Sequence, residues 1–535
     1  MSNTKGPLVL CILDGWGEWH ETRGNALAKA ELPTIKKLDK FYPKTYLQAS
    51  GLAVGLPWGN PGNSEVGHQA MGTGQIIYQK LPVIDAAIED KTFFKNETIK
   101  KTVSWTKENN SNIHIFGLVS DGGVHSHIEH LYALLEALKE QGAKKVFIHA
   151  ITDGRDTAPQ KAKVFIKRLQ SKMESVNIGE IVSVAGRFYT MDRSENWDRV
   201  EKSYLAMTAG EGEKAEDPLE AIDNQYKKEN SDEFIEPTVI TDDEGNPLST
   251  IQEKDALVCF NFRKDRSRQI TEAFSRKDFE FFEKAKLVKN LKVVCFTEYK
   301  AGLPVDIIFE KQKIQTRLGK EVEKAGLSQL RIAETEKFAH VTYFFDGGKG
   351  TDYKKELKIH VPSKDVDSYE NAPEMSAAEV NRELIKAIKK KKFDFIVINY
   401  ANPDMVGHTG NLEAGVKAVE FTDKCLEDLI ENTLKLNGQL LITSDHGNVE
   451  EMVNLENGEK DTEHSSNPVP CWWISKDNHR DIPLSTKSQE YNNIEVEGFL
   501  SDIAPTALDI LKIKKPDSMS GESLMGLFQS KINQE

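Results

Sequence analysis

Short apolar runs rich in β-branched residues alternate with longer amphipathic stretches along most of the chain. The runs have the length and composition of buried strands; they cover residues 8–13, 113–119, 146–151, 181–185, 256–262, 293–296, 393–399 and 439–443. Helical spacing of apolar residues is evident at 128–141, 161–175, 376–390 and 415–434. Strands that alternate with helices predict an α/β architecture, in which mainly parallel sheets are covered by helices on both faces.

Charged and imidazole side chains follow these predicted strands. Asp14 comes directly after the first run, 153–156 (Asp-Gly-Arg-Asp) follows the run at 146–151, and 444–447 (Ser-Asp-His-Gly) follows the run at 439–443. Ligands bind at the carboxyl ends of strands in open α/β sheets, so a functional site is expected there. Any loop is polar, but repeated Asp, His and Arg beside glycine is less expected of a plain connection.

Length and charge narrow the classes of protein. The chain has 535 residues, which favours two domains. Its formal net charge of −14 repels nucleic acid and anionic membranes, so neither is an expected partner and an anionic substrate needs a local cluster of cations. No apolar run approaches the ~18 residues of a membrane span. The five cysteines are scattered without metal-type spacing, which indicates reduced thiols and a cytoplasmic protein.

Three carboxylates and three histidines at strand ends or in Gly/Pro loops could supply two adjacent metal sites: Asp14, Asp404, His408, Asp445, His446 and His464. Asp404 and His408 are four residues apart on a predicted turn with Asn402 as its cap and Pro403 as its first residue, so both side chains point the same way. Each residue alone is better explained as a cap, a turn residue, a surface group or a buried core residue than as a metal ligand. Together, oxygen and nitrogen ligands without thiolate favour Mn²⁺, with Zn²⁺, Co²⁺ or Mg²⁺ as alternatives. Two such ions suit in-line transfer of a phosphoryl group.

Ser64 follows a Gly-Asn pair at the predicted start of a short helix. On this motif alone, a serine that caps the helix is the preferred explanation. However, a helix N-terminus also stabilises an anion, and a serine beside a divalent metal could lose its proton and act as a nucleophile. The sequence therefore leaves both roles open, and the metal-binding candidates favour the second.

Five arginines in the middle of the chain lie in or just after strand-end loops: Arg155, Arg187, Arg193, Arg263 and Arg266. A guanidinium group binds phosphate or carboxylate through two parallel hydrogen bonds. In an acidic chain, such a set predicts a binding site for a small substrate with two anionic groups.

Eleven segments together resemble one known family. They are LDGWGE at 13–18, GNSEVGH at 62–68, SDGGVHSH at 120–127, DGRDT at 153–157, GRFYTMDR at 186–193, NFRKDR at 261–266, ETEKFAHVTYFFDGG at 334–348, NAPEMSA at 371–377, YANPDMVGHTGNLEA at 400–414, TSDHGNVE at 443–450 and HSSNPVP at 464–470. In content and order they resemble the cofactor-independent (2,3-bisphosphoglycerate-independent) phosphoglycerate mutases of the alkaline phosphatase superfamily. Lys264 departs from this pattern, since a proline is common there.

The resemblance implies an α/β protein of two domains. Residues 1–78 and 315–535 would form an alkaline-phosphatase-like, metal-binding domain with a parallel sheet, and residues 79–314 an inserted α/β phosphotransferase domain that binds the substrate. One metal would be held by Asp14, Ser64, Asp445 and His446, and the other by Asp404, His408 and His464. The implied substrate-binding residues are His125, Arg155, Asp156, Arg187, Arg193, Arg263, Arg266 and Lys337, and the implied catalytic residues are Ser64, Asp156 and Lys337. A monomer is the family expectation.

The implied reaction interconverts 3-phosphoglycerate and 2-phosphoglycerate, in glycolysis and gluconeogenesis, through a phosphoserine at Ser64 and without 2,3-bisphosphoglycerate. Asp156 would move the proton. Two alternatives share the same metal scaffold: a phosphomonoesterase, and another phosphomutase such as a phosphopentomutase. A third alternative is a non-catalytic binding or scaffolding protein whose site has lost its activity. The presence of all seven proposed ligands argues against it.

Overall fold

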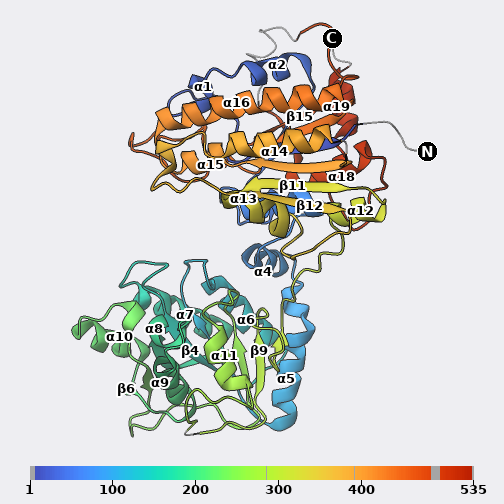
Figure 1. Ribbon diagram of the computed structural model, residues 1–535. Helices are drawn as coiled ribbons and strands as arrows, with labels where there is room; N and C mark the ends of the chain where they lie inside the picture. Colours follow the sequence, from blue (N-terminus) through green and yellow to red (C-terminus); the bar gives the residue numbers. More distant parts are fainter. Residues whose placement is uncertain (1–5, 285, 391, 484–493, 533–535) are drawn as a thin grey trace. The chain divides into compact units, whose positions relative to one another are not determined.

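The computed structural model describes residues 6–284, 286–390, 392–483 and 494–532. The chain folds into two compact units (Figure 1). Unit 1 comprises Met1–Gln79 together with Lys313–Glu535, and unit 2 comprises Lys80–Gln312. Both ends of the chain therefore belong to one unit, and the other is an insertion.

Unit 1 is built on an eight-stranded sheet in the order β12-β11-β13-β1-β14-β15-β2-β16. The first five of these strands are parallel, while β15 runs antiparallel to both of its neighbours. The bounds are β1 Leu8–Leu13, β2 Lys44–Gln48, β11 Gln329–Glu334, β12 Glu356–Val361, β13 Phe395–Tyr400, β14 Gln439–Thr443, β15 Val469–Ile474 and β16 Val496–Phe499.

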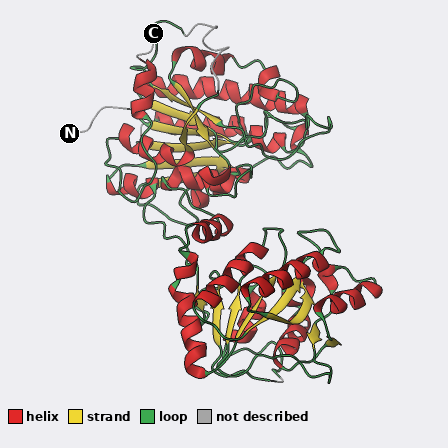
Figure 2. Cartoon of the chain, turned by 180° about the vertical axis from the view of Figure 1, so that it is seen from behind, coloured by secondary structure: helices red, strands yellow, loops and turns green. Residues whose placement is uncertain are grey.

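Helices cover both faces of this sheet (Figure 2). Alternate residues of β1 point to opposite faces, so Val9 and Leu13 pack in the core under α1, α2, α14 and α16, whereas Leu8 and Ile12 pack in the core under α3, α12, α18 and α19. The helices of unit 1 are α1 Ala26–Lys29, α2 Pro33–Phe41, α3 Ser64–Thr73, α12 Leu318–Lys324, α13 Thr335–Ala339, α14 Ala377–Lys389, α15 Asn402–Gly407, α16 Leu412–Lys435, α18 Ile503–Ile510 and α19 Met525–Ile532.

Unit 2 has its own eight-stranded sheet in the order β10-β9-β8-β3-β4-β5-β7-β6, in which only the β5–β7 pairing is antiparallel. Helices again lie on both faces, with separate buried clusters beneath them. The strands are β3 Ile113–Leu118, β4 Val146–Thr152, β5 Glu180–Gly186, β6 Glu213–Ala215, β7 Thr238–Ile240, β8 Ala256–Cys259, β9 Lys292–Cys295 and β10 Asp306–Ile307. The helices are α4 Lys80–Glu89, α5 Glu97–Asn109, α6 Ile128–Glu140, α7 Ala162–Val176, α8 Arg187–Thr190, α9 Trp197–Thr208, α10 Pro218–Lys227 and α11 Arg268–Ser275.

The predicted α/β fold class is confirmed, and each apolar run identified in the sequence overlaps a strand. The largest difference is at β8, which ends at Cys259, three residues before the predicted end. The chain leaves the sheet there because Asn261 turns inward, and its side-chain oxygen accepts a hydrogen bond from the Leu118 amide at 2.9 Å.

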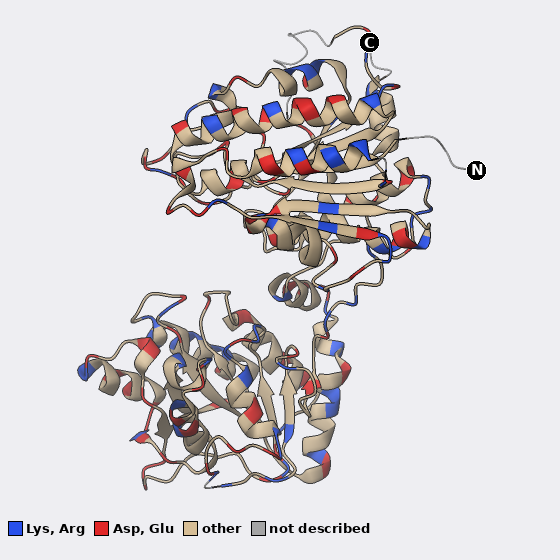
Figure 3. Cartoon of the chain, in the orientation of Figure 1, with Lys and Arg blue, Asp and Glu red and all other residues tan. Residues whose placement is uncertain are grey.

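Helices α14 and α16 carry charged residues of both signs (Figure 3). This pattern is typical of helices with one face in water. Among the described residues, no helix is both long enough and apolar enough to cross a membrane. All five cysteines are buried as free thiols.

Strand β11 ends at Glu334, a carboxyl group that is 1% exposed. Burial raises its pKa to about 7, although Ser363 and the Ser376 amide hydrogen-bond to it and partly oppose this effect. Between pH 4.5, its ordinary pKa, and about 7, the folded state therefore binds more protons than the unfolded state. Stability contributed by this group falls as the pH rises through that window.

We therefore expect Glu334→Gln to melt at the same temperature as the parent near pH 4.5 and to be more stable by about 1–3 kcal/mol at pH 8. Thermal melting of the metal-free protein at the two pH values measures this difference. Glu374→Gln is the control, because Lys364 lowers the pKa of Glu374 and the neutral variant gains nothing at high pH. A Glu334→Gln melting difference that does not change with pH contradicts the assignment.

Candidate active site and metal centre

The carboxyl ends of three neighbouring strands bring the predicted metal ligands of unit 1 together. Asp14 follows β1, which lies between β13 and β14 in parallel register. Asp445 and His446 follow β14, and Asp404 lies on α15, directly after β13. His464 precedes β15. Parallel pairing therefore brings residues that are far apart in sequence to the same edge of the sheet.

Helix α15 begins one residue earlier than predicted. Ala401 is the N-cap and Asn402 is already helical, with its side-chain amide donating to the Pro373 carbonyl at 2.9 Å. The predicted Asn402 cap is therefore wrong, because a tertiary contact uses the amide. Gly407 is required here: a Cβ at that position would lie 2.2 Å from Oδ1 of Asn448. The close approach lets Asn448 donate to Asp404 Oδ1 at 2.9 Å.

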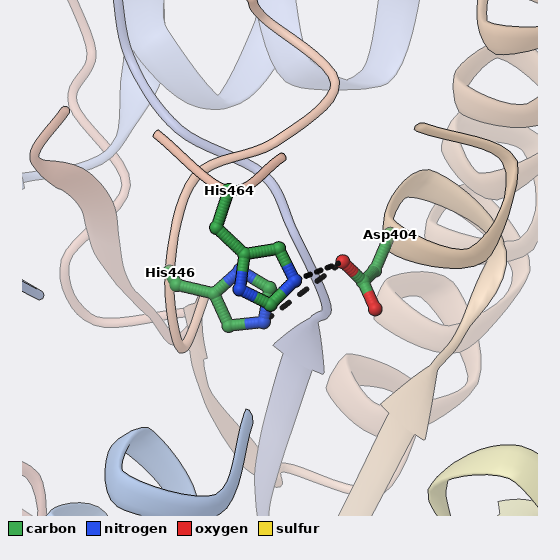
Figure 4. A group of neighbouring side chains, drawn as sticks. All are labelled: Asp404, His446 and His464. Carbon is green, nitrogen blue, oxygen red and sulfur yellow. Dashed lines mark ion pairs between the residues drawn. The ribbon is translucent and has the colours of Figure 1, made fainter. Parts of the chain in front are cut away.

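Three imidazole rings face Asp404. Its Oδ1 lies 3.2 Å from Nε2 of His464, 3.4 Å from Nε2 of His408 and 4.0 Å from Nε2 of His446. Figure 4 shows the His446 and His464 rings directed toward this carboxylate. The two rings are stacked, with centroids 3.9 Å apart. One carboxylate oxygen is thus the meeting point of three ring nitrogens from three loops.

The opposite nitrogen of each ring is held by a backbone carbonyl. Nδ1 of His408 lies 2.7 Å from Thr462 O, and Nδ1 of His464 lies 2.8 Å from Gly62 O. Only a protonated Nδ1 can bond a carbonyl, so in the neutral rings both Nε2 atoms carry lone pairs. These two Nε2 atoms are 3.0 Å apart. Two lone pairs at that distance repel each other unless a cation lies beside them, and ligand histidines are commonly oriented in this way.

Ser64 lies at a second cluster of charged groups. Its Oγ is 3.2 Å from Asp14 Oδ1, 3.0 Å from His446 Nε2 and 2.7 Å from Lys337 Nζ. The Lys337 ammonium also contacts Asp14 Oδ1 and Asp404 Oδ2, each at 2.6 Å. All of these side chains are buried. The serine hydroxyl thus lies where the two carboxylates and the ammonium meet.

Opposite charges set the protonation of this cluster. Burial alone raises the pKa of Asp14, but Lys337 and His446 outweigh it and hold the pKa well below its usual range. Burial lowers the pKa of Lys337, but Asp14 and Asp404 more than compensate, so the amine stays charged. Burial also lowers the pKa of His446, while Asp445 and then Asp14 raise it to about 9. The cluster is therefore ionised at neutral pH.

Ser64 does not cap its helix. The N-cap of α3 is Asn63, whose side chain accepts a hydrogen bond from the Val66 amide at 3.1 Å. Ser64 is the first residue of the helix, and its side chain points to Asp14, His446 and Lys337. The capping explanation of this serine is wrong, because the neighbouring asparagine has that role.

Two groups of side chains could each hold a metal ion. Asp404, His446 and His464 form one group and Asp14, Asp445 and His446 another, each with ligand atoms within 4.8 Å of one another. His446 belongs to both groups, whereas His408 joins the first through its contacts with Asp404 and His464. Asp445 Oδ2 is buried; it lies 3.1 Å from Nδ1 of His68 and 3.6 Å from Nε2 of His446, but it accepts no well-aligned hydrogen bond from the residues that the structure describes.

Glu450 organises these loops and was not identified from the sequence. It is fully buried, and its Oε2 accepts hydrogen bonds from the amides of Gly17 and Asn448, both at 2.9 Å. Its Oε1 accepts hydrogen bonds from the side chains of Ser465 and Asn467. One carboxylate therefore ties together the loops that carry Asp14, His446 and His464. Glu450 could have been identified from the sequence because it lies in the TSDHGNVE segment, beside Asp445 and His446.

In unit 2, Arg187 is the best-anchored arginine of the predicted set. It is 1% exposed, and its Nη1 donates to Asp153 Oδ1 and Asp156 Oδ2, both at 2.6 Å. Asp153 also accepts hydrogen bonds from the Asp156 amide and from the Ser120 hydroxyl. Asp153 thus fixes the loop that carries Arg155 and Asp156, although sequence reasoning gave it no role.

A second carboxylate, Asp265, joins three more of the predicted residues. Its Oδ2 lies 3.2 Å from Arg193 Nη1, and its Oδ1 lies 3.0 Å from Arg263 Nε and 3.7 Å from Nδ1 of His125. Burial, followed by the charge of Arg187, lowers the pKa of His125 to about 4. His125 is therefore neutral at physiological pH and can donate or accept a hydrogen bond.

The remaining arginines complete a region of excess positive charge. Arg266 donates to the Met191 carbonyl at 3.1 Å, and Arg155 lies 3.5 Å from Glu233. Burial lowers the pKa of Arg266, and the neighbouring guanidinium groups lower it further. Like charges gathered in this way are stabilised by an anion. Lys337 is the one predicted substrate-binding residue outside this cluster, since it lies in unit 1 against Ser64.

Comparison with known proteins places the chain in a class. Residues 84–301 match the model described as the N-terminus of BPG-independent PGAM, and residues 312–492 match type I phosphodiesterase / nucleotide pyrophosphatase. These matches and the sheet of unit 1 define a protein of the alkaline phosphatase superfamily with an inserted α/β unit. The chain belongs to the 2,3-bisphosphoglycerate-independent phosphoglycerate mutase family, which confirms the resemblance found in the sequence.

The sequences of similar proteins match this chain over nearly their full length. A protein of that name from Clostridium acetobutylicum is 48% identical over 97% of this chain and 99% of its own. One from Listeria welshimeri is 45% identical over 98% of this chain and 99% of its own. Among solved structures, the phosphoglycerate mutase of Leishmania mexicana, crystallised at low cobalt concentration, is 29% identical with a TM-score of 0.58 and 97% coverage of both chains.

Proposed function

We propose that this protein interconverts 3-phosphoglycerate and 2-phosphoglycerate, as a glycolytic and gluconeogenic enzyme, without 2,3-bisphosphoglycerate. The observation that carries the proposal is the position of Ser64, whose hydroxyl contacts Asp14, His446 and Lys337 instead of capping its helix. The names of the similar proteins support the substrate, and the matches cover nearly all of this chain.

Unit 1 would receive the phosphoryl group. Asp14, Ser64, Asp445 and His446 would hold one divalent cation, and Asp404, His408 and His464 the other. Mn²⁺ is the preferred ion, with Zn²⁺, Co²⁺ and Mg²⁺ as alternatives, because the donors are oxygen and imidazole nitrogen. When bound, such ions withdraw charge from a serine hydroxyl and from phosphoryl oxygens. Lys337 adds an ammonium 2.7 Å from Ser64 Oγ, where negative charge gathers during transfer.

The proposed reaction consists of two successive phosphoryl transfers. In the first, Ser64 Oγ loses its proton and bonds to phosphorus as the bond from phosphorus to O3 of glycerate breaks and O3 gains a proton. In the second, the 2-hydroxyl loses its proton and bonds to the same phosphorus, and Ser64 Oγ leaves and regains a proton. Asp156 is the proposed proton carrier for glycerate, because its Oδ2 is anchored on Arg187 and this holds the carboxylate in a fixed orientation.

Unit 2 would hold glycerate between the two transfers. Its carboxylate would bind the guanidinium cluster of Arg155, Arg187, Arg193, Arg263 and Arg266, with His125 as a neutral hydrogen-bonding partner. Retention of glycerate separates a mutase from a phosphomonoesterase, which releases the alcohol and gives the phosphoryl group to water. The excess positive charge around Arg266 supports this role.

An enolase-coupled assay on 3-phosphoglycerate, with 2,3-bisphosphoglycerate omitted, tests the proposal. We expect turnover that depends on added Mn²⁺, stops on chelation and releases little inorganic phosphate. Activity that requires 2,3-bisphosphoglycerate, or phosphate release as the main reaction, contradicts the proposal. A ribose phosphate as second substrate separates this activity from that of a phosphopentomutase.

A further inference from the structure

Behind Ser64, the side chains of His68 and Asn399 form a buried pair that has no part in the proposed mechanism. His68 lies on α3, one turn after Ser64, and Asn399 lies near the end of β13. They are 0% and 1% exposed. The apolar run at 393–399 predicted Asn399 only as the end of a strand, and GNSEVGH predicted no role for His68. Polar side chains that are excluded from solvent need hydrogen-bond partners within the protein.

The orientation of the Asn399 amide follows from its neighbours. Its Nδ2 lies 2.6 Å from Asp14 Oδ2 and 3.1 Å from Nε2 of His68. The reversed amide would set an oxygen against the Asp14 carboxylate, which is repulsive. The amide nitrogen therefore donates one proton to Asp14 and the other to the histidine ring.

This orientation fixes the tautomer of His68. Since Nε2 accepts from Asn399, the ring proton of the neutral histidine is on Nδ1. Nδ1 lies 2.9 Å from the Ser64 carbonyl oxygen and 3.1 Å from Asp445 Oδ2. The same proton thus faces the nucleophile's own peptide group and a carboxylate from the loop after β14.

The contacts form a continuous chain from Asp14 through Asn399 and His68 to Ser64 and Asp445. They link β1, β13, α3 and the loop after β14, which are far apart in sequence. Asp14 and Asp445 carry like charges, so they would separate or rotate if nothing held them. Asn399 fixes Asp14 Oδ2 by a hydrogen bond, and His68 Nδ1 lies 3.1 Å from Asp445 Oδ2. Asp14 Oδ1 is left directed toward Ser64 and Lys337.

We propose that His68 and Asn399 are positioning residues that hold Asp14 and Asp445 in the geometry for binding a divalent cation beside Ser64. This inference rests on the proposed function, because it assigns a purpose to the cation-binding group. Groups that orient metal ligands typically change metal affinity or activity by about 10–100-fold when they are removed. A pair that only filled space would change stability and leave metal affinity as it was.

The test measures Mn²⁺ binding to the chelator-stripped, full-length protein by calorimetry. Asn399→Leu removes the donor with little change of volume, and His68→Phe keeps a ring without nitrogen atoms. We expect each to weaken Mn²⁺ binding by about 10–100-fold at one of two sites. His68→Asn places an amide near the position of Nδ1, so it keeps the donor toward Ser64 and Asp445. It should recover part of the affinity that His68→Phe loses.

Asn381→Leu is the matched control. Asn381 is also a buried asparagine of unit 1, and its Oδ1 accepts a hydrogen bond from the Tyr400 hydroxyl at 2.9 Å. Its replacement should lower the melting temperature and leave Mn²⁺ affinity unchanged. The comparison separates the cost of losing a buried amide from the loss of ligand orientation.

Parent-like Mn²⁺ affinity in both Asn399→Leu and His68→Phe would overturn the positioning role. If Asn399→Leu fails to fold, equal affinities in His68→Phe and His68→Asn overturn it in the same way. A parent protein that binds Mn²⁺ without converting 3-phosphoglycerate contradicts the proposed function instead, and the affinities of the variants still decide the role of the pair.

Discussion

Ser64→Ala should abolish conversion of 3-phosphoglycerate, with a loss of roughly 10⁴-fold or more, the scale on which removal of a nucleophile acts. The fold should persist, because Asn63 caps α3 and keeps its hydrogen bond to Val66. Mn²⁺ binding should weaken but remain measurable, since Asp14, Asp445 and His446 are unchanged. Loss of activity with the metals still bound would separate the chemical role of the hydroxyl from a structural one.

The measurement is kcat in the coupled assay at saturating Mn²⁺, with metal content determined on the same sample. Ser203→Ala is the control, because Ser203 is a buried serine of unit 2 whose hydroxyl bonds only to Thr190 among the contacts described. It should keep activity within a few-fold of the parent. If Ser64→Ala retained a tenth of the parental kcat with metals bound, the phosphoserine route would be excluded.

Lys337→Met should have the second-largest effect, and it should act on both stability and activity. In the metal-free protein, the Lys337 ammonium contacts Asp14 and Asp404 at 2.6 Å. Its removal leaves two buried carboxylates without this partner, a change that typically costs about 3–5 kcal/mol. Activity should fall by about 10²–10³-fold, as when one group that stabilises developing charge is lost.

Thermal melting with and without Mn²⁺ measures the stability effect. Added Mn²⁺ should raise the melting temperature of Lys337→Met more than that of the parent, because the ions supply the missing positive charge. Lys44→Met is the matched control, because Lys44 pairs with Glu18 and Asp39 at 2.9 and 3.2 Å and neither carboxylate is a proposed ligand. The stability lost in Lys44→Met should be the same with and without Mn²⁺. Equal Mn²⁺ responses in Lys337→Met and the parent would contradict the charge-neutralising role.

The strands that the sequence predicted are mostly apolar, although β15, which is equally apolar, was not predicted. Strand β11 was not predicted, because QLRIAE carries Arg331 in its centre. Arg331 is nonetheless fully buried, where it lies 3.4 Å from Glu356 and over the rings of Phe345 and Phe395. A charged residue with an internal partner breaks the hydrophobic pattern without breaking the strand, and only the folded structure reveals the partner.

The ligand candidates were predictable because carboxyl ends of parallel strands meet at one edge of a sheet. The structure does bring Asp14, Asp404 and His446 together there. The residues that hold them were not predictable in the same way. Asn399 is the last residue of the apolar run at 393–399. Glu450 is a buried carboxylate without a cationic partner among the described contacts. Their roles depend on which side chains face each other across strands and loops.

The choice between the two roles considered for Ser64, helix cap or nucleophile, also depended on tertiary contacts. A shift of one residue, with Asn63 as the N-cap, turns Ser64 from a capping residue into a side chain directed at Lys337. Sequence preferences for Asn and Ser at this position are nearly equal, so they could not decide between the two. The cap at Asn63 excludes the capping role, and the charged groups around the hydroxyl support the proposed role as nucleophile.

The most direct test of the account is to trap the phosphoryl group on the protein. The Mn²⁺-loaded parent is mixed with 3-phosphoglycerate, quenched in acid during turnover and digested, and its phosphopeptides are identified by mass spectrometry. The account predicts a phosphoryl group on Ser64, formed from either 3- or 2-phosphoglycerate and absent in Ser64→Ala. Turnover with no phosphoryl group on Ser64, or with one on a different residue, would contradict it.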